Sequence, residues 1–319
     1  MQKAKKGEKS LIYTITLNPA IDLVIVTKKL EPKVVNRTEK FELQPNGKGV
    51  NVSFILKKLG IDSVATGIGG GFTLDYVISG LKEKGIQTNF LKVKDLTRVN
   101  VFTDVLDEKT EYKQVNPGPE VSLEKQNQFL DYLESTLTKD DMVVVSGSFS
   151  RGIKPHYLVQ LAELVQKQGA KFVVDSSYLE VIDTLKYRPF LLKPNDAELA
   201  AFFNYEGKMT DEKTVAFAQK LVKLGCQNVL VSLGAAGAAF INERHILFAN
   251  APKIQVVNSA CAGDTMLGTF IAFLEKKKTI SEALKIAVAA GSDTASRTGL
   301  TDFSLNNLLP QISVTERMN

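Results

Sequence analysis

The chain has 319 residues, of which 44% are hydrophobic and 24% charged, and its formal net charge is +5. This composition is typical of a globular protein with one or two domains, and every apolar run is shorter than the roughly 18–20 residues of a membrane span. Tryptophan is absent and no basic run is interleaved with aromatic residues, which argues against nucleic acid as a partner, whereas modest positive charge suits small anionic substrates. Two cysteines and two histidines, without metal-ligand spacing, argue against a disulfide framework or zinc site and favour the cytoplasm.

Apolar, β-branched runs alternate with helical patterns along the chain. The basic N-terminus, 1–10, has no apolar segment after it, so we expect a flexible tail rather than a secretion signal. The alternation that follows predicts a mostly parallel sheet with helices on both faces. The predicted strands are 11–17, 142–148, 171–175, 190–193 and 228–234, and the predicted helices are 50–60, 154–169, 211–224, 262–277 and 280–297.

Two stretches interrupt this alternation. Residues 22–44 and 99–116 alternate apolar and polar side chains, which is typical of strands with one face in water. We expect them to form a small separate sheet that acts as a flap over a ligand at the strand ends. An edge extension of the main sheet without a covering role is the alternative. The small sheet could also pair with its copy in a homodimer, although a monomer is equally compatible.

The segment QPNGKGVNVS at 44–53 leads into the predicted helix 50–60. Its glycines allow a ligand to approach the backbone, Lys48 supplies positive charge, and Asn51 lies in the first turn of the helix. This arrangement suits a phosphate or a polyol, and an ordinary turn with an amide cap is the alternative. The segment is not a Walker A loop, because Gly49 follows Lys48 where that loop requires Ser or Thr.

Two further segments follow predicted strands. In LKPNDAEL at 192–199, Asn195 and Glu198 have the spacing of a capping box. Glu198 could also help to hold a hydrated magnesium ion near nucleotide phosphates. In VSLGAAGAA at 231–239, the glycines would let a flat or anionic ligand lie against the backbone, although a hairpin of small residues gives the same pattern.

The segment NSACAGDTMLGTF at 258–270 places an acid between a turn of small residues and an apolar helical run. A helix that begins near Ala262 directs its free N–H groups and its positive dipole end toward the turn. The amides of Ala262, Gly263 and Asp264 could therefore form an anion hole. The Asp264 carboxylate could accept a proton from a hydroxyl that attacks a phosphorus atom held there. A helix-capping Asp is the alternative.

Three other polar residues are candidates for ligand contacts. Asp22 follows the first strand and could hydrogen-bond to substrate hydroxyls. Arg98 precedes a strand of the small sheet and could pair with a phosphate, and Ser148 ends the run SGS after a predicted strand. Taken alone, each is more often a surface or turn residue.

The order of these segments resembles the PfkB carbohydrate kinases, the ribokinase-like family. The resemblance covers 11–305 and depends on the combination, because no single motif is specific. Three segments look most like the sugar-phosphate branch of this family, which includes 1-phosphofructokinase and tagatose-6-phosphate kinase. They are NPAID at 18–22, TR at 97–98 and NPGP at 116–119. In chain order the motifs are NPAID (18–22), GKGVN (47–51), SGS (146–148), KPNDAE (193–198), SLGAAG (232–237) and AGD (262–264).

The resemblance implies a single kinase domain over 1–319. Its fold would be a ribokinase-like α/β/α sandwich with a mostly parallel central sheet and a small β lid formed by about 22–44 and 99–116. The implied reaction moves the γ-phosphoryl group of ATP, with Mg²⁺, to a hydroxyl of a ketohexose phosphate. Fructose 1-phosphate, giving fructose 1,6-bisphosphate, is the first expected acceptor, and tagatose 6-phosphate and fructose 6-phosphate are the alternatives.

The resemblance also implies site residues by matched position. Asp264 would be the catalytic base, and Ala262 and Gly263 would belong to the anion hole. The sugar phosphate would face Asp22, Gly47, Lys48, Asn51, Arg98 and Ser148. Nucleotide contacts would come from Lys193, Asn195, Ser232, Gly234 and Gly237, and the magnesium contact from Glu198.

Three positions depart from the pattern that the resemblance leads us to expect. Asn46 and Cys261 stand where glycines are usual, and Leu74 stands where this branch commonly has glycine. Asn tolerates left-handed backbone angles, so we expect the cradle to survive, whereas Cys261 restricts its turn and its thiol could contact phosphate or simply pack. The Asn46 and Cys261 departures motivate a second hypothesis, a sensor that binds sugar phosphate or nucleotide without catalysis. Tight binding without ADP formation would favour the sensor.

Overall fold

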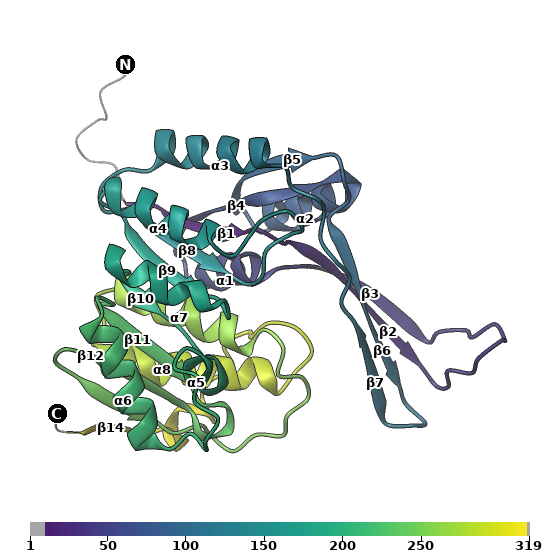
Figure 1. Cartoon of the computed structure of the whole chain (residues 1–319). Coiled ribbons are helices and arrows are strands. Elements are labelled where there is room, and N and C mark those ends of the chain that lie inside the picture. The colour runs from purple at the N-terminus through teal and green to yellow at the C-terminus, as the bar shows by residue number, and fades with distance from the viewer. Residues whose placement is uncertain (1–9, 318–319) are drawn as a thin grey trace.

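A computed structural model describes residues 10–317 of the chain. It contains a ten-stranded sheet with helices on both faces and a separate four-stranded sheet (Figure 1). The expected α/β/α sandwich is therefore confirmed. The tail expected over 1–10 falls on residues 1–9, which lie outside the described residues, and on Ser10, which is exposed.

Strands and helices alternate through most of the chain. The strands of the large sheet are β1 (Ile12–Thr16), β4 (Ser63–Gly70), β5 (Gln87–Val93), β8 (Met142–Ser146), β9 (Lys171–Asp175), β10 (Leu191–Leu192), β11 (Asn228–Ser232), β12 (Ala238–Asn242), β13 (Ile246–Ala249) and β14 (Val314–Arg317). The helices are α1 (Lys48–Lys58), α2 (Gly71–Glu83), α3 (Leu123–Thr136), α4 (Tyr157–Lys167), α5 (Asp196–Ala201), α6 (Asp211–Lys223), α7 (Ala262–Glu275) and α8 (Ile280–Ala295), with 3₁₀ segments η1 (Leu179–Tyr187), η2 (Gly234–Ala236) and η3 (Leu309–Gln311).

The large sheet is parallel over most of its width and antiparallel at one edge. Its strand order is β14-β13-β12-β11-β10-β9-β8-β1-β4-β5. Neighbours from β11 to β5 pair in parallel, and β11 to β14 pair antiparallel. The carboxyl ends of the parallel strands therefore meet at one edge, which is where open α/β sheets bind ligands.

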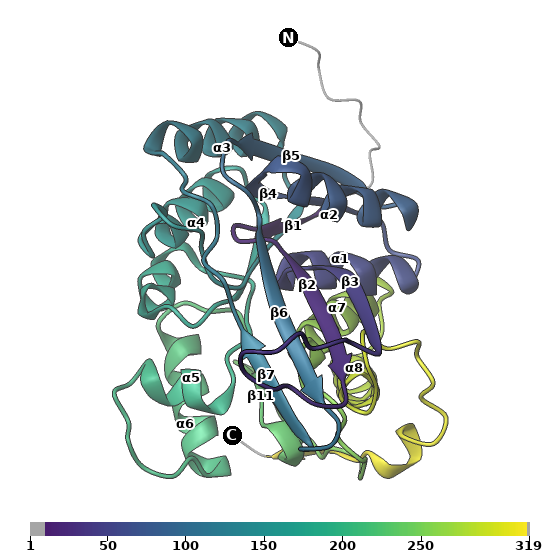
Figure 2. The same ribbon diagram turned by 90° about the vertical axis from the view of Figure 1, so that its right-hand side faces the viewer.

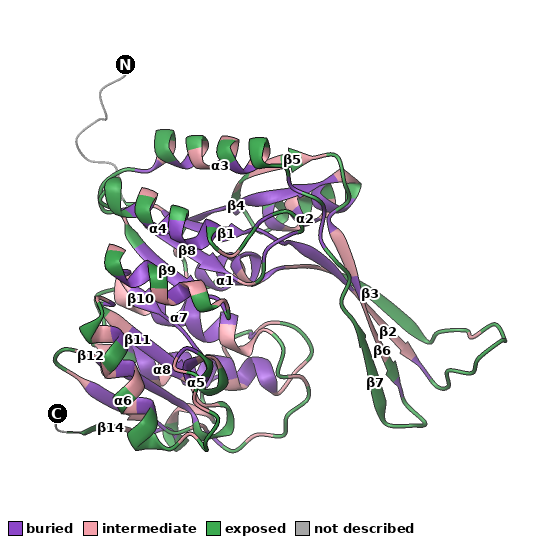
Figure 3. Ribbon diagram, in the orientation of Figure 1, coloured by how far each residue is buried: buried purple, intermediate pink, exposed green. Residues whose placement is uncertain are grey.

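Alternate side chains of the central strands enter two hydrophobic cores. In β8, Val143 and Val145 pack with residues of α3, α4 and α6, while Met142 and Val144 pack with residues of α1, α7 and α8. This two-residue period places successive side chains on opposite faces of the sheet. Figure 3 shows burial concentrated in the sheet and on the inner faces of these helices. The central strands can therefore be apolar along their whole length.

The small sheet projects from the rest of the molecule in Figure 1, and Figure 2 shows it facing the viewer. Its order is β3-β2-β6-β7, and it consists of β2 (Ala20–Thr27), β3 (Lys40–Asn46), β6 (Arg98–Val105) and β7 (Thr110–Gln114). The central pair, β2 and β6, is parallel, and both outer pairs are antiparallel. The stretches with alternating polarity thus form a sheet of their own rather than an edge extension of the large sheet.

The structure adds elements that the sequence pattern did not predict. These are β4, β5, α2, α3 and the antiparallel edge from β12 to β14. In α3 only Gln126, Phe129 and Leu133 are buried, so its apolar face is too narrow to give a strong helical pattern. Among the helices of residues 10–317, none has the length and apolar character needed to cross a bilayer.

Candidate active site

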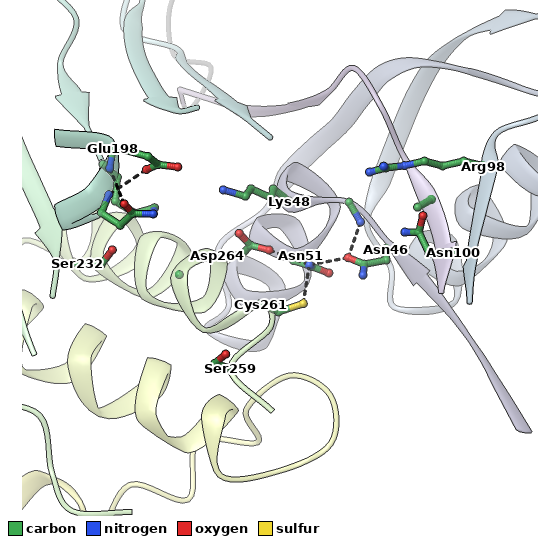
Figure 4. Close-up of a pocket in the computed structure, with 15 residues that line it drawn as sticks. Asn46, Lys48, Asn51, Arg98, Asn100, Glu198, Ser232, Ser259, Cys261 and Asp264 are labelled. Atoms are coloured by element: carbon green, nitrogen blue, oxygen red, sulfur yellow. Dashed lines mark hydrogen bonds between the residues drawn. The ribbon is translucent and has the colours of Figure 1, made fainter. Parts of the chain in front are cut away.

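A cleft of about 410 Å³ lies between the ends of the central strands and the root of the small sheet (Figure 4). Segments from distant parts of the chain meet there: the start of α1, the residues after β10, the start of α7 and the first residue of β6. The residues that line it are Ala20, Asn46, Gly47, Lys48, Asn51, Arg98, Asn100, Lys193, Asn195, Glu198, Ser232, Ser259, Cys261, Gly263 and Asp264.

Most of the site residues predicted from the sequence come together in this region. Those in the first cleft are Gly47, Lys48, Asn51, Arg98, Lys193, Asn195, Glu198, Ser232, Gly263 and Asp264. A second cleft, which adjoins the first, is lined by Gly234, Gly237 and Ala262 among others. Asp22 and Ser148 line neither cleft.

Two glycines allow α1 to begin against the end of β1. Gly47 is the N-cap residue with φ 136°, and a Cβ atom there would lie 2.7 Å from Thr16 Cγ2. At Gly49 a Cβ atom would lie 2.5 Å from Thr16 Oγ1. Any side chain at either position would therefore clash with the strand. The close packing fixes the backbone on both sides of Lys48, whose side chain extends into the cleft (Figure 4).

A buried carboxylate holds two lysines beside the cleft. Asp175, the last residue of β9, is fully buried, and its Oδ1 atom lies 3.3 Å from Lys48 Nζ and 3.1 Å from Lys193 Nζ. Burial alone would raise the pKa of Asp175, but the two ammonium groups outweigh burial and lower that pKa. For Lys48, burial acts to lower the pKa. The negative charges of Asp175, then Asp264 and Glu198, outweigh burial, so the pKa of Lys48 is raised. Lys48 therefore stays charged beside any bound anion.

The turn before α7 holds a non-glycine residue in a left-handed conformation. Cys261 is the N-cap residue, with φ 62°, a conformation that costs residues with a Cβ atom roughly 1–2 kcal/mol. Its Sγ atom lies 3.2 Å from Asn51 Nδ2. Burial, followed by the nearby Asp264 carboxylate, raises the pKa of the Cys261 thiol to about 12, so this thiol remains protonated and packs against the Asn51 amide.

Asp264 lies in the first turn of α7 and is almost completely buried. Its side chain is 4% exposed, and its Oδ2 atom accepts a hydrogen bond of 2.9 Å from Asn51 Nδ2. Burial and then the Asp175 carboxylate raise the pKa of Asp264 to about 6, while the two lysines and the Asn51 amide act in the opposite direction. A carboxylate with this pKa is matched to proton transfer near neutral pH.

The start of α7 also provides an anion site. The first main-chain bond of the helix runs from the Thr265 N–H to the Cys261 carbonyl at 2.9 Å. The N–H groups of Gly263 and Asp264 precede it, so the helix itself does not use them. A Cβ atom at Gly263 would lie 3.4 Å from Lys193 Nζ. Helix dipole, free N–H groups and an ammonium group therefore act on the same space.

The second cleft is larger, about 800 Å³, and more apolar. It shares Asn195, Ser232, Ser259 and Gly263 with the first cleft. Gly237, with φ 105°, allows the close turn into β12, because a Cβ atom there would lie 1.9 Å from the Ala249 carbonyl oxygen. A volume of this size with a largely apolar lining suits a planar aromatic ring. The apolar lining includes Pro252, Ile254, Val256, Met266, Val288 and Ala295.

The capping box predicted at the start of α5 is present. Glu198 N–H donates to Asn195 Oδ1 at 2.7 Å, and Asn195 N–H donates to Glu198 Oε2 at 2.9 Å. The box uses one oxygen of the Glu198 carboxylate and leaves the other for a ligand. In residues 10–317 no group of three or more His, Cys, Asp or Glu side chains is gathered for a metal ion. A hydrated magnesium ion held by phosphate oxygens needs only one or two carboxylates, and Glu198 fits this requirement.

Arg98 faces the first cleft from the small sheet (Figure 4). Its Nη atoms donate to the carbonyl groups of Asn116 and Asn18 at 3.4 and 3.3 Å, and its Nε atom is buried without a partner. Burial lowers the pKa of the Arg98 guanidinium, and the Asp22 carboxylate partly offsets this effect. Its hydrogen-bond acceptors are neutral, so its charge is suited to an anionic ligand.

Asp22 lies behind the wall of the cleft rather than on its surface. Its two carboxylate oxygens accept hydrogen bonds from Asn46 Nδ2 and, at 2.8 Å, from Asn100 Nδ2. Those two asparagines line the cleft. Ser148 is exposed and accepts a hydrogen bond of 3.3 Å from Asn18 Nδ2. The structure thus puts the amide groups of Asn46 and Asn100 where the sequence analysis expected Asp22, and it places Ser148 outside both clefts.

The explanation given for Asn46 from the sequence is wrong. Asn46 is not among the residues with positive φ, whereas Gly47 is, so tolerance of left-handed angles is not needed at this position. The Asn46 side chain instead accepts hydrogen bonds from the Gly47 N–H at 2.6 Å and from Asn51 Nδ2 at 2.8 Å. The third departure, Leu74, is completely buried on α2 and does not line the cleft.

Sequence reasoning missed Asp175, Asn100 and Ser259. The first carried a usable signal, because KFVVD at 171–175 is a predicted buried strand that ends in an acid. An acid at the carboxyl end of a parallel strand is a candidate ligand-site residue. Asn100 and Ser259 lie in segments of ordinary polarity and carried no comparable signal.

The chain is similar to curated carbohydrate kinases over nearly its whole length. A family model described as "pfkB family carbohydrate kinase" matches residues 9–307. A D-tagatose-1-phosphate kinase from Bacillus licheniformis is 39% identical over 306 residues, which are 96% of this chain and 99% of the relative. A 1-phosphofructokinase from Bacillus subtilis is 36% identical over 307 residues, with 96% and 99% of the two chains covered.

A solved structure shares the fold over nearly the whole length of both chains. The phosphofructokinase-2 from Escherichia coli in complex with fructose-6-phosphate has a TM-score of 0.84 and 29% sequence identity, and the match covers 94% of this chain and 98% of that one. Fold, site geometry and the family model agree. The chain belongs to the pfkB family of carbohydrate kinases.

Proposed function

We propose that the protein is an ATP-dependent kinase that phosphorylates a hydroxyl group of a ketohexose phosphate. The observation that carries this proposal is the position of Asp264. A buried carboxylate with a raised pKa lies in the first turn of a helix whose N-terminus forms an anion site. A proton acceptor beside an anion site is the arrangement that phosphoryl transfer to a hydroxyl requires.

The two adjoining clefts suit the two substrates. The apolar cleft suits the base and ribose of ATP, with Gly234 and Gly237 against the nucleotide. The residues shared by both clefts, together with Lys193, would contact its phosphates. Magnesium, when bound, would neutralise phosphate charge, and Glu198 would be the protein residue that holds the hydrated ion.

In the proposed reaction, Asp264 accepts the proton of the acceptor hydroxyl. The hydroxyl oxygen then forms a bond to the γ-phosphorus as the bond from that phosphorus to the ADP oxygen breaks. The free N–H groups of Gly263 and Asp264 would stabilise the charge on the transferred group, whereas the Ala262 N–H, which the sequence analysis included, donates to the Ser259 carbonyl at 3.4 Å. The Lys48 and Lys193 ammonium groups, held by Asp175, would act on the same phosphoryl oxygens.

The acceptor would lie on the other side of Asp264, with its own phosphate at Arg98. Positive charge at that end favours a sugar that is already phosphorylated over a free sugar. Fructose 1-phosphate remains the first candidate. The relatives' names add D-tagatose 1-phosphate, which the sequence analysis did not consider, and tagatose 6-phosphate and fructose 6-phosphate follow. Gly47, Lys48 and Asn51, with the amides in front of Asp22, would contact its hydroxyl groups.

ADP release with magnesium and ATP would test the proposal directly. The acceptor panel would be fructose 1-phosphate, D-tagatose 1-phosphate, tagatose 6-phosphate, fructose 6-phosphate and free fructose. We expect efficient turnover of a ketohexose 1-phosphate and little turnover of free fructose. Tight binding of ATP and of a sugar phosphate without ADP formation would instead support the sensor hypothesis, which the Cys261 strain and the Asn46 substitution motivate.

The small sheet would act as a lid over the cleft. It would also pair with the small sheet of a second copy to form a dimer. Apolar side chains are exposed on it, with Phe41 67% and Tyr112 46% accessible, and the outer strand β7 is exposed along its whole length. These features support pairing between the small sheets of two copies. Sedimentation of the wild type and of Phe41→Asp would test it. A lighter species in the variant would support pairing through this face.

A further inference from the structure

A chain of side-chain hydrogen bonds runs from the small sheet to the carboxylate of Asp264. Asn100 Nδ2 donates to Asp22 Oδ1 at 2.8 Å, and Asn46 Nδ2 donates to Asp22 Oδ2. Asn51 Nδ2 then donates to Asn46 Oδ1 at 2.8 Å and to Asp264 Oδ2 at 2.9 Å. The first three residues belong to β6, β2 and β3 of the small sheet, and the last two belong to α1 and α7.

Asn46 is the point at which this chain crosses between the two parts of the molecule. It is the last residue of β3, and it uses both ends of its amide. The NH₂ group donates to Asp22, and the oxygen accepts from Asn51 and from the Gly47 N–H at 2.6 Å. Glycine, which the family resemblance leads us to expect at this position, could make none of these side-chain contacts.

The Asn51 amide has more acceptors than hydrogen atoms. Its NH₂ group carries two hydrogens, but Asn46 Oδ1, Asp264 Oδ2 and Cys261 Sγ all lie within 3.2 Å of its nitrogen. Both residues that replace usual glycines therefore contact the one amide that holds Asp264. A neutral oxygen is a better acceptor than a thiol sulfur, so Asn46 and Asp264 take the two hydrogens.

We propose that Asn46 is a positioning residue that couples the small sheet to the base by fixing the Asn51 amide against Asp264. The contacts that carry this inference are independent of the reaction, and its catalytic consequence rests on the proposed function. Loss of the Asn46 side chain frees the Asn51 amide to turn toward Cys261 and leaves one oxygen of Asp22 without its partner.

Other charged and titratable groups face Asp264 from every side. Lys48 faces it from α1, Lys193 from the segment after β10, Asp175 from β9 and the Cys261 thiol from the turn before α7. A substitution at Asn46 removes none of them. A change in the titration of Asp264 in such a variant therefore reports the hydrogen bond from Asn51 rather than a change in the surrounding charges.

The test is a carbon-13 NMR titration of the Asp264 carboxyl group in the full chain without ligands, assigned with Asp264→Asn. In Asn46→Gly the pKa of Asp264 should rise by about half a unit to one unit, because a hydrogen bond to the charged form is lost. An unchanged pKa would overturn the proposal. Asn46→Ala removes the same amide without the added backbone freedom of glycine, so it serves if Asn46→Gly does not fold.

Kinetics supply the second readout. We expect Asn46→Gly to lower kcat with a sugar phosphate by about tenfold, the equivalent of one lost hydrogen bond to a charged group, while the KM for ATP stays the same. Asn36→Gly is a matched control, because within residues 10–317 the side chain of Asn36 bonds only to Glu31 and Val34 in the exposed loop between β2 and β3. Equal losses of sugar-phosphate and ATP affinity in Asn46→Gly would mean a merely structural role.

The two proposals can fail separately. If the wild type turns over no sugar phosphate, the proposed function fails, and the NMR titration still decides whether Asn46 fixes Asp264. If the wild type is active and Asn46→Gly titrates and reacts like it, the positioning role fails alone. In the double variant Asn46→Gly with Cys261→Gly, loss of the competing thiol should restore part of kcat, because the Asn51 amide then has Asp264 as its main acceptor.

Discussion

The two ends of the cleft are built differently. At the end proposed for the nucleotide, the turns after β10 and β11, the start of α7 and packed apolar side chains form the surface, supported by largely buried strands. At the end proposed for the sugar, side-chain amides and Arg98 project from a sheet with exposed outer strands. Backbone geometry is fixed by packing on the large sheet, whereas side-chain geometry here depends on neighbouring side chains. Substitutions at the two ends should therefore affect different kinetic constants.

The largest effect is expected where the two ends meet, at Asp264. Asp264→Asn keeps the shape of the side chain but removes the proton acceptor, so kcat should fall about 10³-fold while both substrates still bind. Kinetics and calorimetric binding would check this. Asp211→Asn is a matched control, because Asp211 also lies in the first turn of a helix, α6, but pairs with Arg317 far from the cleft. Retention of most of kcat in Asp264→Asn would exclude the base.

A smaller effect, confined to one end, is expected at Arg98. Arg98→Ala removes the charge proposed to hold the sugar phosphate, so the KM for that substrate should rise about 10–100-fold with the KM for ATP unchanged. Arg37→Ala, in the exposed loop of the same small sheet, is the control for loss of a positive charge. An equal rise in KM for both substrates would mean that Arg98 has a structural role. The two ends of the cleft would then not differ in the way proposed.

The pH dependence should follow Asp264. Its carboxylate must be ionised to accept a proton, and its pKa is raised from 3.8 to about 6. Below that pH, kcat/KM should therefore fall about tenfold per pH unit as the group becomes protonated, and above it the profile should level off. The profile of Asn46→Gly should fall at a higher pH than that of the wild type, because the pKa of Asp264 is expected to rise in this variant. A wild-type profile that stays level down to pH 5 and falls only below it would contradict this assignment.

The smallest effect is expected at the nucleotide end, at Glu198. Glu198→Gln keeps an oxygen that can accept the capping hydrogen bond but removes the negative charge. The magnesium concentration for half-maximal activity should rise several-fold, while the melting temperature changes little. Glu282→Gln, in the capping box of α8, is the matched control and should leave the magnesium dependence unchanged. A fall in melting temperature without a change in magnesium dependence would mean that Glu198 caps α5 and does not hold magnesium.

The difference between the ends also decides what could be predicted from the sequence. Buried strands and the capping box at Asn195 each follow from local chemistry, and the structure confirms them. The ion pairs of Asp175 with Lys48 and Lys193 join residues that are 127 and 18 positions apart, and no local pattern encodes such a contact. The role of Asn46 was likewise misjudged, because its contacts with Asp22 and Asn51 exist only after the small sheet folds against α1.

The small sheet is attached to the body at its first residues. Ala20 and Arg98 are opposite each other in the register of β2 and β6. They lie at the end where the chain enters the small sheet from β1 and from β5. If the small sheet swings, these residues lie near the pivot and move least, while the far turns travel along the widest arc. A phosphate held by Arg98 would then stay in place through every opening, and the rest of the sugar could be covered and uncovered without losing its anchor.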